Sequence, residues 1–460
     1  MILMRPGLAG CIAILLLPVN ANAAGGPNLV LPYWSLTPFV LLLLAIAVLP
    51  LVAARFWHSN RNKGVVAAIC GAPVALYLVY LQIATGQPAM AALAHELEQY
   101  AAFIVLLGSL YTVSGGIIFS GDVDPRPLNN TVLLGFGSLL ANFVGTTGAS
   151  LLLIRPLLRI NKKRRVTGHL PVFFIFTVSN LGGLLTPLGD PPLFLGFLNG
   201  VPFHWTLRLW PEWLLSNGMV LAVFFVWDRR AYRKEPAKET TLKETQNPPR
   251  LVRGLINFPL LIGILGAVIL QGTLPGYWGG LGGPAIMLAM GILSLYLTPA
   301  GLRQSNSFTW EPISEVAILF AGIFVTMIPA LALLATQGQN LNITKPYEYF
   351  WLSGVLSAHL DNAPTYLTFA TMAAGSDDFG LLVNNRVAGL DGPLVLQAIS
   401  CGAVMMGALA YIGNGPNFMV KAIAEQAGFK MPSFFGYLAY SYAVLIPVFL
   451  AITLFFFYPR

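Results

Sequence analysis

The sequence predicts an all-α polytopic membrane protein, and two observations support this class. Hydrophobic residues make up 56% of the 460 residues and charged residues only 10%, whereas soluble domains carry about 25% charged residues. Uncharged runs such as 38–54 and 441–458 are close to the ~20 apolar residues that a membrane-crossing helix needs. The chain has only three cysteines, which are too few for a disulfide framework.

Residues 1–23 have the pattern of a signal peptide. Arg5 gives a basic start, the run AGCIAILLLPV an apolar core, and Ala21-Asn22-Ala23 a cleavage site of the A-x-A type. The alternative is an uncleaved first helix.

Ten apolar stretches predict membrane spans. They cover residues 35–54, 65–85, 98–120, 168–200, 211–228, 254–273, 282–298, 313–336, 392–428 and 433–457. Gly and Pro residues break 168–200 and 392–428 near their middles. Two further apolar stretches, 129–158 and 347–374, are also interrupted, and each half is too short to cross a core of about 30 Å. We therefore expect each of these two stretches to form a re-entrant hairpin.

The distribution of Lys and Arg predicts the orientation. With the mature N-terminus outside, 21 of the 26 Lys and Arg residues fall in cytoplasmic segments and four fall outside, as is typical of membrane proteins. The net charge of +8 then reflects orientation and not nucleic-acid binding. We expect a multi-pass protein of the bacterial inner membrane with a periplasmic mature N-terminus. The charged segment 229–253 is then a flexible cytoplasmic linker between 24–228 and 254–460.

These two parts are predicted to be inverted-topology repeats. Each has three spans, a hairpin, a broken transmembrane helix and a last span. The first hairpin is followed by the basic run RINKKRR (159–165), whereas the second is followed by the acidic loop 375–392. The two loops therefore lie on opposite sides of the membrane. Corresponding interrupted segments in inverted halves are typical of the binding site of a secondary transporter.

The four interruptions share a chemistry that suits ion binding. The hairpin tips read ANFVGTTGAS (141–150) and SAHLDNAPTY (357–366), and the broken spans read SNLGGLLTPLGD (179–190) and YIGNGPNF (411–418). Gly and Pro free backbone groups that lipid cannot hydrogen-bond. The freed backbone carbonyls and the Asn, Ser and Thr side chains offer oxygen ligands, which suit Na⁺ because it is a hard cation. The N-terminal ends of half-helices suit an anionic substrate.

Two carboxylates, Asp190 and Asp361, fall at corresponding interruptions of the two halves. An acid at membrane depth is costly, and its default interpretation is functional. For Asp190, which precedes two prolines, capping of the following half-helix is an open alternative. Asp361 has no proline at the first helical position, so we expect it to bind the cation and the proton in turn.

The motifs SNLGGLLTPLGDPPLFLGFL (179–198) and LDNAPTYL (360–367) resemble the ion transporter superfamily. The nearest branch contains citrate transport and sodium:proton antiport proteins, which are related to arsenite permeases and dicarboxylate transporters. The resemblance covers the whole mature chain. It implies a homodimer in which hairpins and broken helices bind Na⁺ and substrate and move as an elevator.

The resemblance and the two carboxylates together give the candidate ion and substrate ligands. They are Asn142, Thr146, Thr147, Ser179, Asn180, Asp190, Asp361, Asn362, Thr365, Asn414 and Asn417. The Na⁺ ligands are expected among Asn180, Asp361, Asn362 and Asn414.

The hairpin tips depart from the Ser-Asn-Thr pattern of the dicarboxylate transporters. Here they read Val144-Gly145-Thr146-Thr147 and Leu360-Asp361-Asn362-Ala363. The added aspartate favours sodium:proton antiport, and cation-coupled citrate or dicarboxylate transport is the alternative. The expected partners are the lipid bilayer and a small ion or carboxylate, with no nucleic acid and no cofactor besides the transported Na⁺ or H⁺.

An intramembrane aspartic protease is a remote alternative from another class. Those enzymes pair a Tyr-Asp with a Gly-x-Gly-Asp, but Pro187 stands in place of the first glycine. Their Pro-Ala-Leu motif follows both aspartates, whereas here 329–331 precedes Asp361. We therefore do not expect an enzyme.

Overall fold

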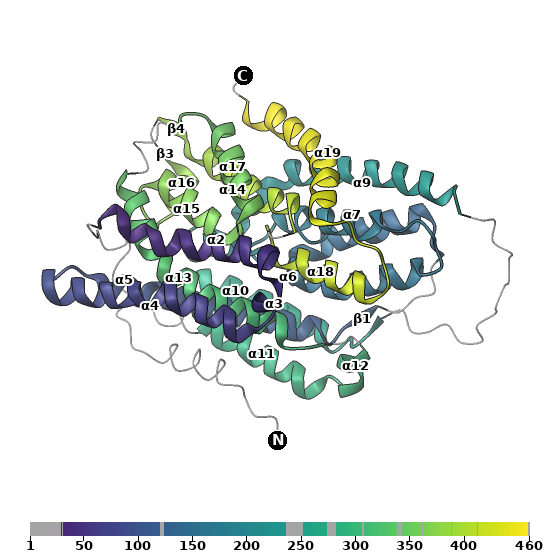
Figure 1. Ribbon diagram of the computed structural model, residues 1–460, viewed down its shortest axis with the longest axis horizontal. Coiled ribbons are helices and arrows are strands. Elements are labelled where there is room, and N and C mark those ends of the chain that lie inside the picture. The colour runs from purple at the N-terminus through teal and green to yellow at the C-terminus, as the bar shows by residue number, and fades with distance from the viewer. Residues whose placement is uncertain are drawn as a thin grey trace.

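The computed structural model describes most of the chain (Figure 1). It covers residues 29–458 apart from 30, 120–123, 236–251, 274–281, 306–307, 338–342, 361, 388 and 412. The predicted signal peptide, most of the predicted linker and the side chain of Asp361 therefore lie outside the described residues.

The first half is mainly helical, and its helices follow the predicted order. They are η1 (Tyr33–Leu36), α2 (Thr37–Val52), α3 (Ala54–Trp57), α4 (Asn60–Thr85), α5 (Ala89–Ser114), α6 (Pro127–Asn161), α7 (His169–Thr177), η2 (Leu181–Leu184), α8 (Pro191–Leu198), η3 (Phe203–Leu209) and α9 (Trp210–Tyr232). Strand β1 (Ile118–Phe119) pairs antiparallel with β2 (Val252–Arg253).

The second half has a comparable order of helices, with the pair α14 and α15 in the place that α6 has in the first half. It contains α10 (Asn257–Thr273), α11 (Gly283–Leu297), α12 (Ala300–Ser305), α13 (Glu311–Gln337), α14 (Pro346–His359), α15 (Asn362–Ala374), α16 (Gly380–Asn384), α17 (Gly392–Met406), η6 (Gly407–Leu409), α18 (Gly415–Gln426), α19 (Phe434–Ile452) and a closing π-helical turn, η7 (Thr453–Phe457). Strands β3 (Arg386–Val387) and β4 (Leu390–Asp391) form a short antiparallel pair. Every predicted span has a helical counterpart.

Eight helices among the described residues are long and apolar enough to cross a membrane. Their burial differs widely: 28% of the apolar window in α4 is buried inside the protein, against 72% in α6 and 83% in α17. A membrane helix can expose apolar side chains to lipid, so α6 and α17 form the interior while α4 faces outward. The predicted class, an all-α polytopic membrane protein, is confirmed.

Helix α6 reverses direction at Gly145. A straight helix of its 35 residues would be about 52 Å long. Instead, Asn130 near its start and Asn161 at its end hydrogen-bond to each other, at 3.0 and 2.8 Å. Gly145 has φ 77° and ψ 155°, a conformation that is essentially restricted to glycine. The interruption predicted in 129–158 is therefore a sharp turn between two antiparallel arms.

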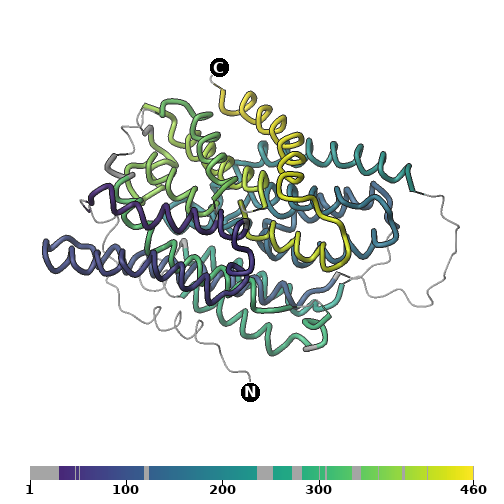
Figure 2. The backbone as a smooth tube through the Cα atoms, viewed as in Figure 1, coloured from purple at the N-terminus to yellow at the C-terminus, as the bar shows by residue number. Residues whose placement is uncertain are grey.

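The interrupted elements of both halves lie together. Helices α14 and α15, which flank the interruption predicted in 347–374, pack against each other. Helix α15 also contacts α8. Helix α6 contacts η2 from its own half and α18 from the other half. Figure 2 shows these first-half and second-half segments side by side in the middle of the molecule. The uninterrupted helices α4, α5, α10, α11 and α13 form a separate group that packs mainly within itself.

Candidate functional site

Asp190 ends the interruption between η2 and α8. Its backbone is extended, with φ −147° and ψ 147°, and its carbonyl accepts the first helical hydrogen bond from Leu193 N at 3.1 Å. Pro191 and Pro192 follow and offer no backbone N–H to a capping side chain. The carboxylate makes no capping hydrogen bond to α8. The capping alternative for Asp190 is therefore wrong, and its side chain serves another purpose.

The Asp190 carboxylate instead receives donors from the other three interruptions. Thr146 Oγ1, at the tip of α6, donates to Oδ1 at 2.8 Å. Asn414 Nδ2, before α18, lies 3.2 Å from the same oxygen, and Asn362 Nδ2, at the start of α15, donates to Oδ2. At most 3% of each of these four residues is exposed. One carboxylate thus joins both hairpin tips to both broken spans.

Asn362 has an unsatisfied group at this site. Its Oδ1 atom is buried and has no hydrogen-bond partner among the described residues, although its Nδ2 binds Asp190. Buried acceptors in native proteins are normally satisfied, and an unsatisfied one often marks an ion or water position. A carboxylate beside a free amide oxygen is a donor set that suits a hard cation.

The two broken spans are also linked directly by their asparagines. Asn180 Nδ2 donates to Asn417 Oδ1 at 2.7 Å, and Asn414 Nδ2 lies 3.2 Å from Asn180 Oδ1. The same amides bind carbonyls that the helix breaks leave free: Asn180 binds the carbonyl of Ile175 at 2.8 Å, and Asn417 that of Gly407 at 2.9 Å. Side-chain amides thus replace the missing helical hydrogen bonds.

The first hairpin tip is fixed to the first broken span. Asn142 Oδ1 accepts from Leu185 N at 2.8 Å, and Thr146 N donates to Gly189 O at 2.8 Å. A Cβ atom on Gly189 would lie 2.1 Å from Gly183 O, so only glycine fits there. The PLGD segment therefore crosses close against η2, which aims the carboxylate of the next residue at the hairpin tip.

The structure brings most of the predicted ligands into one hydrogen-bonded cluster. Its members are Thr146, Ser179, Asn180, Asp190, Asn362, Asn414 and Asn417. Asn142 positions the adjoining backbone, and Thr365 is buried one turn after Asn362. Thr147 is half-buried, and Asp361 lies outside the described residues. A role for each in ion binding stays a prediction.

Sequence reasoning missed Ser150. Its Oγ lies 2.8 Å from Ser179 Oγ, so it connects the second arm of α6 to the first broken span. Ser150 follows Thr146 by four residues, and side chains at this spacing share one helix face. That spacing is the signal that could have identified it.

Broken helices that assemble a buried polar site in a helical membrane protein are typical of secondary transporters. The model of a family described as "Putative citrate transport" matches residues 28–457. The chain belongs to this family, which confirms the resemblance that the two motifs indicated. No curated protein matches the chain.

Proposed function

We propose that this chain exchanges Na⁺ for protons, with the Asp190 carboxylate as the group for which the two cations compete. The observation that carries the proposal is the convergence of Thr146, Asn362 and Asn414 on Asp190. Sequence reasoning assigned the coupling role to Asp361 instead. The contacts of the described residues favour Asp190, and a role for Asp361 stays a separate prediction.

The Asp190 carboxyl group can account for the exchange of Na⁺ for a proton. When Asp190 is ionised, its oxygens and Asn362 Oδ1 offer hard ligands to Na⁺. When it is protonated, the carboxyl is neutral and its charge no longer attracts a cation. Both states are compatible with the neutral hydroxyl and amide groups around it. Because one carboxyl cannot hold both cations, Na⁺ entry requires proton departure.

The arrangement of the helices supports an alternating-access mechanism. We propose that α6 and the α14–α15 pair are re-entrant hairpins of two inverted repeats, in a homodimer whose linker is cytoplasmic. The reversal at Gly145 and the repeated order of elements favour this architecture. The interrupted elements pack together and contact the uninterrupted helices mainly through α5 and α13, so we propose that they move as one body along that contact.

Cation-coupled citrate transport is the second candidate, and two observations favour it. One is the family itself. The other is Arg155 on the second arm of α6, whose Nη1 atom is buried without a hydrogen-bond partner among the described residues. Arg155 follows Ser150 by five residues, about 7.5 Å along the helix. A guanidinium group pairs readily with a substrate carboxylate, and this one lies on the same arm as the site.

Everted membrane vesicles with a pH-sensitive dye test both candidates. Added Na⁺ or Li⁺ should release protons from wild-type vesicles, and Asp190→Asn should abolish the signal at matched expression. Asp124→Asn is the control, because the Asp124 side chain is 56% exposed and lies outside the site. Normal exchange by Asp190→Asn would refute the assignment. A signal that requires a citrate gradient would favour the second candidate.

A further inference from the structure

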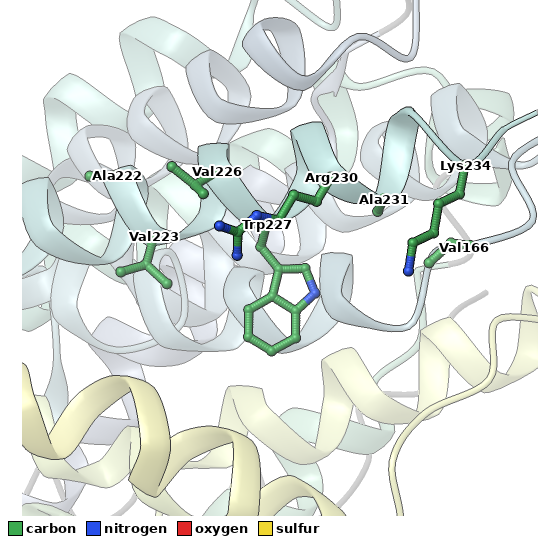
Figure 3. Close-up of a pocket in the computed structure, with 8 residues that line it drawn as sticks. All are labelled: Val166, Ala222, Val223, Val226, Trp227, Arg230, Ala231 and Lys234. Carbon is green, nitrogen blue, oxygen red and sulfur yellow. The ribbon is translucent and has the colours of Figure 1, made fainter.

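A groove lies along the outer face of the C-terminal part of α9, which we call the α9 groove (Figure 3). It has a volume of about 600 Å³. It is lined by Val166, Ala222, Val223, Val226, Trp227, Arg230, Ala231 and Lys234. None of the residues assigned to the ion site contributes to it, so it is a second and separate feature of the molecule.

The chemistry of the α9 groove changes along its length. Val223 and Val226 are 40% and 47% exposed and make one end apolar. Trp227 follows, and Arg230 and Lys234 line the other end. Residues three or four positions apart share a helix face, so these groups form one continuous strip. A ligand that matches the strip has an apolar body and a negatively charged head.

Within the part of the chain that the structure describes, no carboxylate neutralises the charges at the basic end. Among the described residues, neither Arg230 nor Lys234 forms an ion pair. The neighbouring carboxylates are occupied elsewhere. Asp228 is buried against Arg164, 2.6 Å away, and Glu235 accepts hydrogen bonds from the backbone N–H groups of Arg165 and Val166, at 2.9 to 3.0 Å. An anion at this end would therefore meet two cationic groups that no described carboxylate pairs with.

We propose that the α9 groove binds an anionic phospholipid of the surrounding bilayer. The lipid phosphate lies between Arg230 and Lys234, Trp227 marks the interface, and an acyl chain lies along Val226 and Val223. Tryptophan is enriched at the membrane–water interface, and basic pockets beside transmembrane helices bind acidic lipid headgroups. A free phosphate would use only the basic end, so the apolar strip favours the lipid.

The groove also touches the base of the first hairpin. Val166 comes directly after the basic run that contains Arg164, and Arg164 pairs with Asp228 on the inner side of α9. A lipid that holds Val166 and the end of α9 together would thus stabilise the attachment of the hairpin. This inference does not depend on which ion or solute is transported.

Lipid binding to the purified full-length protein in neutral detergent tests the proposal. Phosphatidylglycerol, phosphatidylcholine and inorganic phosphate are titrated separately, with native mass spectrometry and the midpoint of thermal unfolding as readouts. Phosphatidylglycerol should bind wild type and raise the midpoint, and the other two should do neither. The variant R230Q/K234Q should bind phosphatidylglycerol about 10- to 30-fold more weakly.

The matched control is R229Q/R233Q, which removes the same charge from the neighbouring positions at the end of α9. Arg229 and Arg233 are exposed but do not line the groove. This control should bind phosphatidylglycerol like wild type, and both variants should unfold like wild type without lipid. If both variants bind phosphatidylglycerol equally weakly, general surface charge explains the binding and the proposal is overturned. Equal binding of phosphatidylcholine, or of inorganic phosphate, would overturn it as well.

Discussion

Removing the Asp228 carboxylate should detach the base of the first hairpin. Asp228, His169 and Arg164 are almost wholly buried, with His169 Nε2 at 2.8 Å and Arg164 Nη2 at 2.6 Å from the carboxylate. Asn130 donates to the other oxygen at 2.9 Å, and Asn130 in turn binds Asn161. The network therefore ties both ends of α6 to α9. We expect Asp228→Ala to destabilise the protein strongly.

The size of the effect follows from the burial of the pair. Only 3% of the Arg164 side chain and none of the Asp228 side chain is exposed. Breaking such a pair leaves a buried charge without a partner and costs about 3–5 kcal/mol. Replacing both partners by apolar residues removes that uncompensated charge. The double variant Arg164→Leu/Asp228→Leu should therefore lie within about 2 kcal/mol of wild type.

The free energy of unfolding in mixed micelles, titrated with a denaturing detergent, measures these differences. Glu425→Gln is the control, because Glu425 pairs with Lys421 at 3.0 Å on the surface, where its side chain is 48% exposed. An exposed pair of this kind contributes less than about 0.5 kcal/mol. If Asp228→Ala unfolds within 1 kcal/mol of that control, the network does not hold the hairpin as argued.

Four further changes test separate parts of the structure. Gly145→Ala should cost about 1–3 kcal/mol because φ is positive there, whereas Gly108→Ala in α5, where a Cβ meets nothing within 4 Å, should leave thermal unfolding unchanged. Arg155→Gln should lower citrate uptake in vesicles and spare Na⁺-driven proton release, and equal loss of both would remove Arg155 from anion binding. A Gly/Ser replacement of 236–251 should leave transport intact at normal membrane abundance, since this charged stretch lies between the halves. Asp361→Asn should abolish coupled transport at matched expression, and normal exchange would show that Asp361 is not required.

The order of the helices could be predicted because Gly and Pro within apolar runs are a local signal. The predicted ends of the membrane spans were less accurate than their order, above all where polar residues are buried. The span predicted at 98–120 overlaps α5, which begins at Ala89 and ends at Ser114. The polar residues Glu96 and Gln99 interrupt the apolar run at this end of the span, but Gln99 is buried and exchanges hydrogen bonds with Asn199 at 3.0 and 3.1 Å. A partner 100 residues away cannot be read from local composition.

The candidate ion site also depends on contacts between residues that lie far apart in the sequence. From the sequence, Asp190 had a sufficient local explanation as a helix cap, and Asp361 had none, so Asp361 was assigned the coupling role. The deciding contacts of Asp190 come from Thr146, Asn362 and Asn414, which are 44, 172 and 224 residues away. Only the reversal of α6 and the packing of α15 and α18 bring them together.

The side chain of Asp190 does not cap α8 because two prolines follow it. A capping carboxylate needs a backbone N–H within the first helical turn, and Pro191 and Pro192 remove the first two. The helix still begins, since proline presets the helical φ, and the Asp190 carboxylate points to Thr146 and Asn362 at the two hairpin tips. The two prolines therefore allow α8 to begin without a hydrogen bond from the Asp190 side chain.

Replacing Pro192 with Ala restores an N–H at the second helical position. If that donor draws the carboxylate back to α8, exchange in everted vesicles should fall although Asp190 itself is unchanged; full activity in Pro192→Ala would show that the cluster holds Asp190 without help from the prolines.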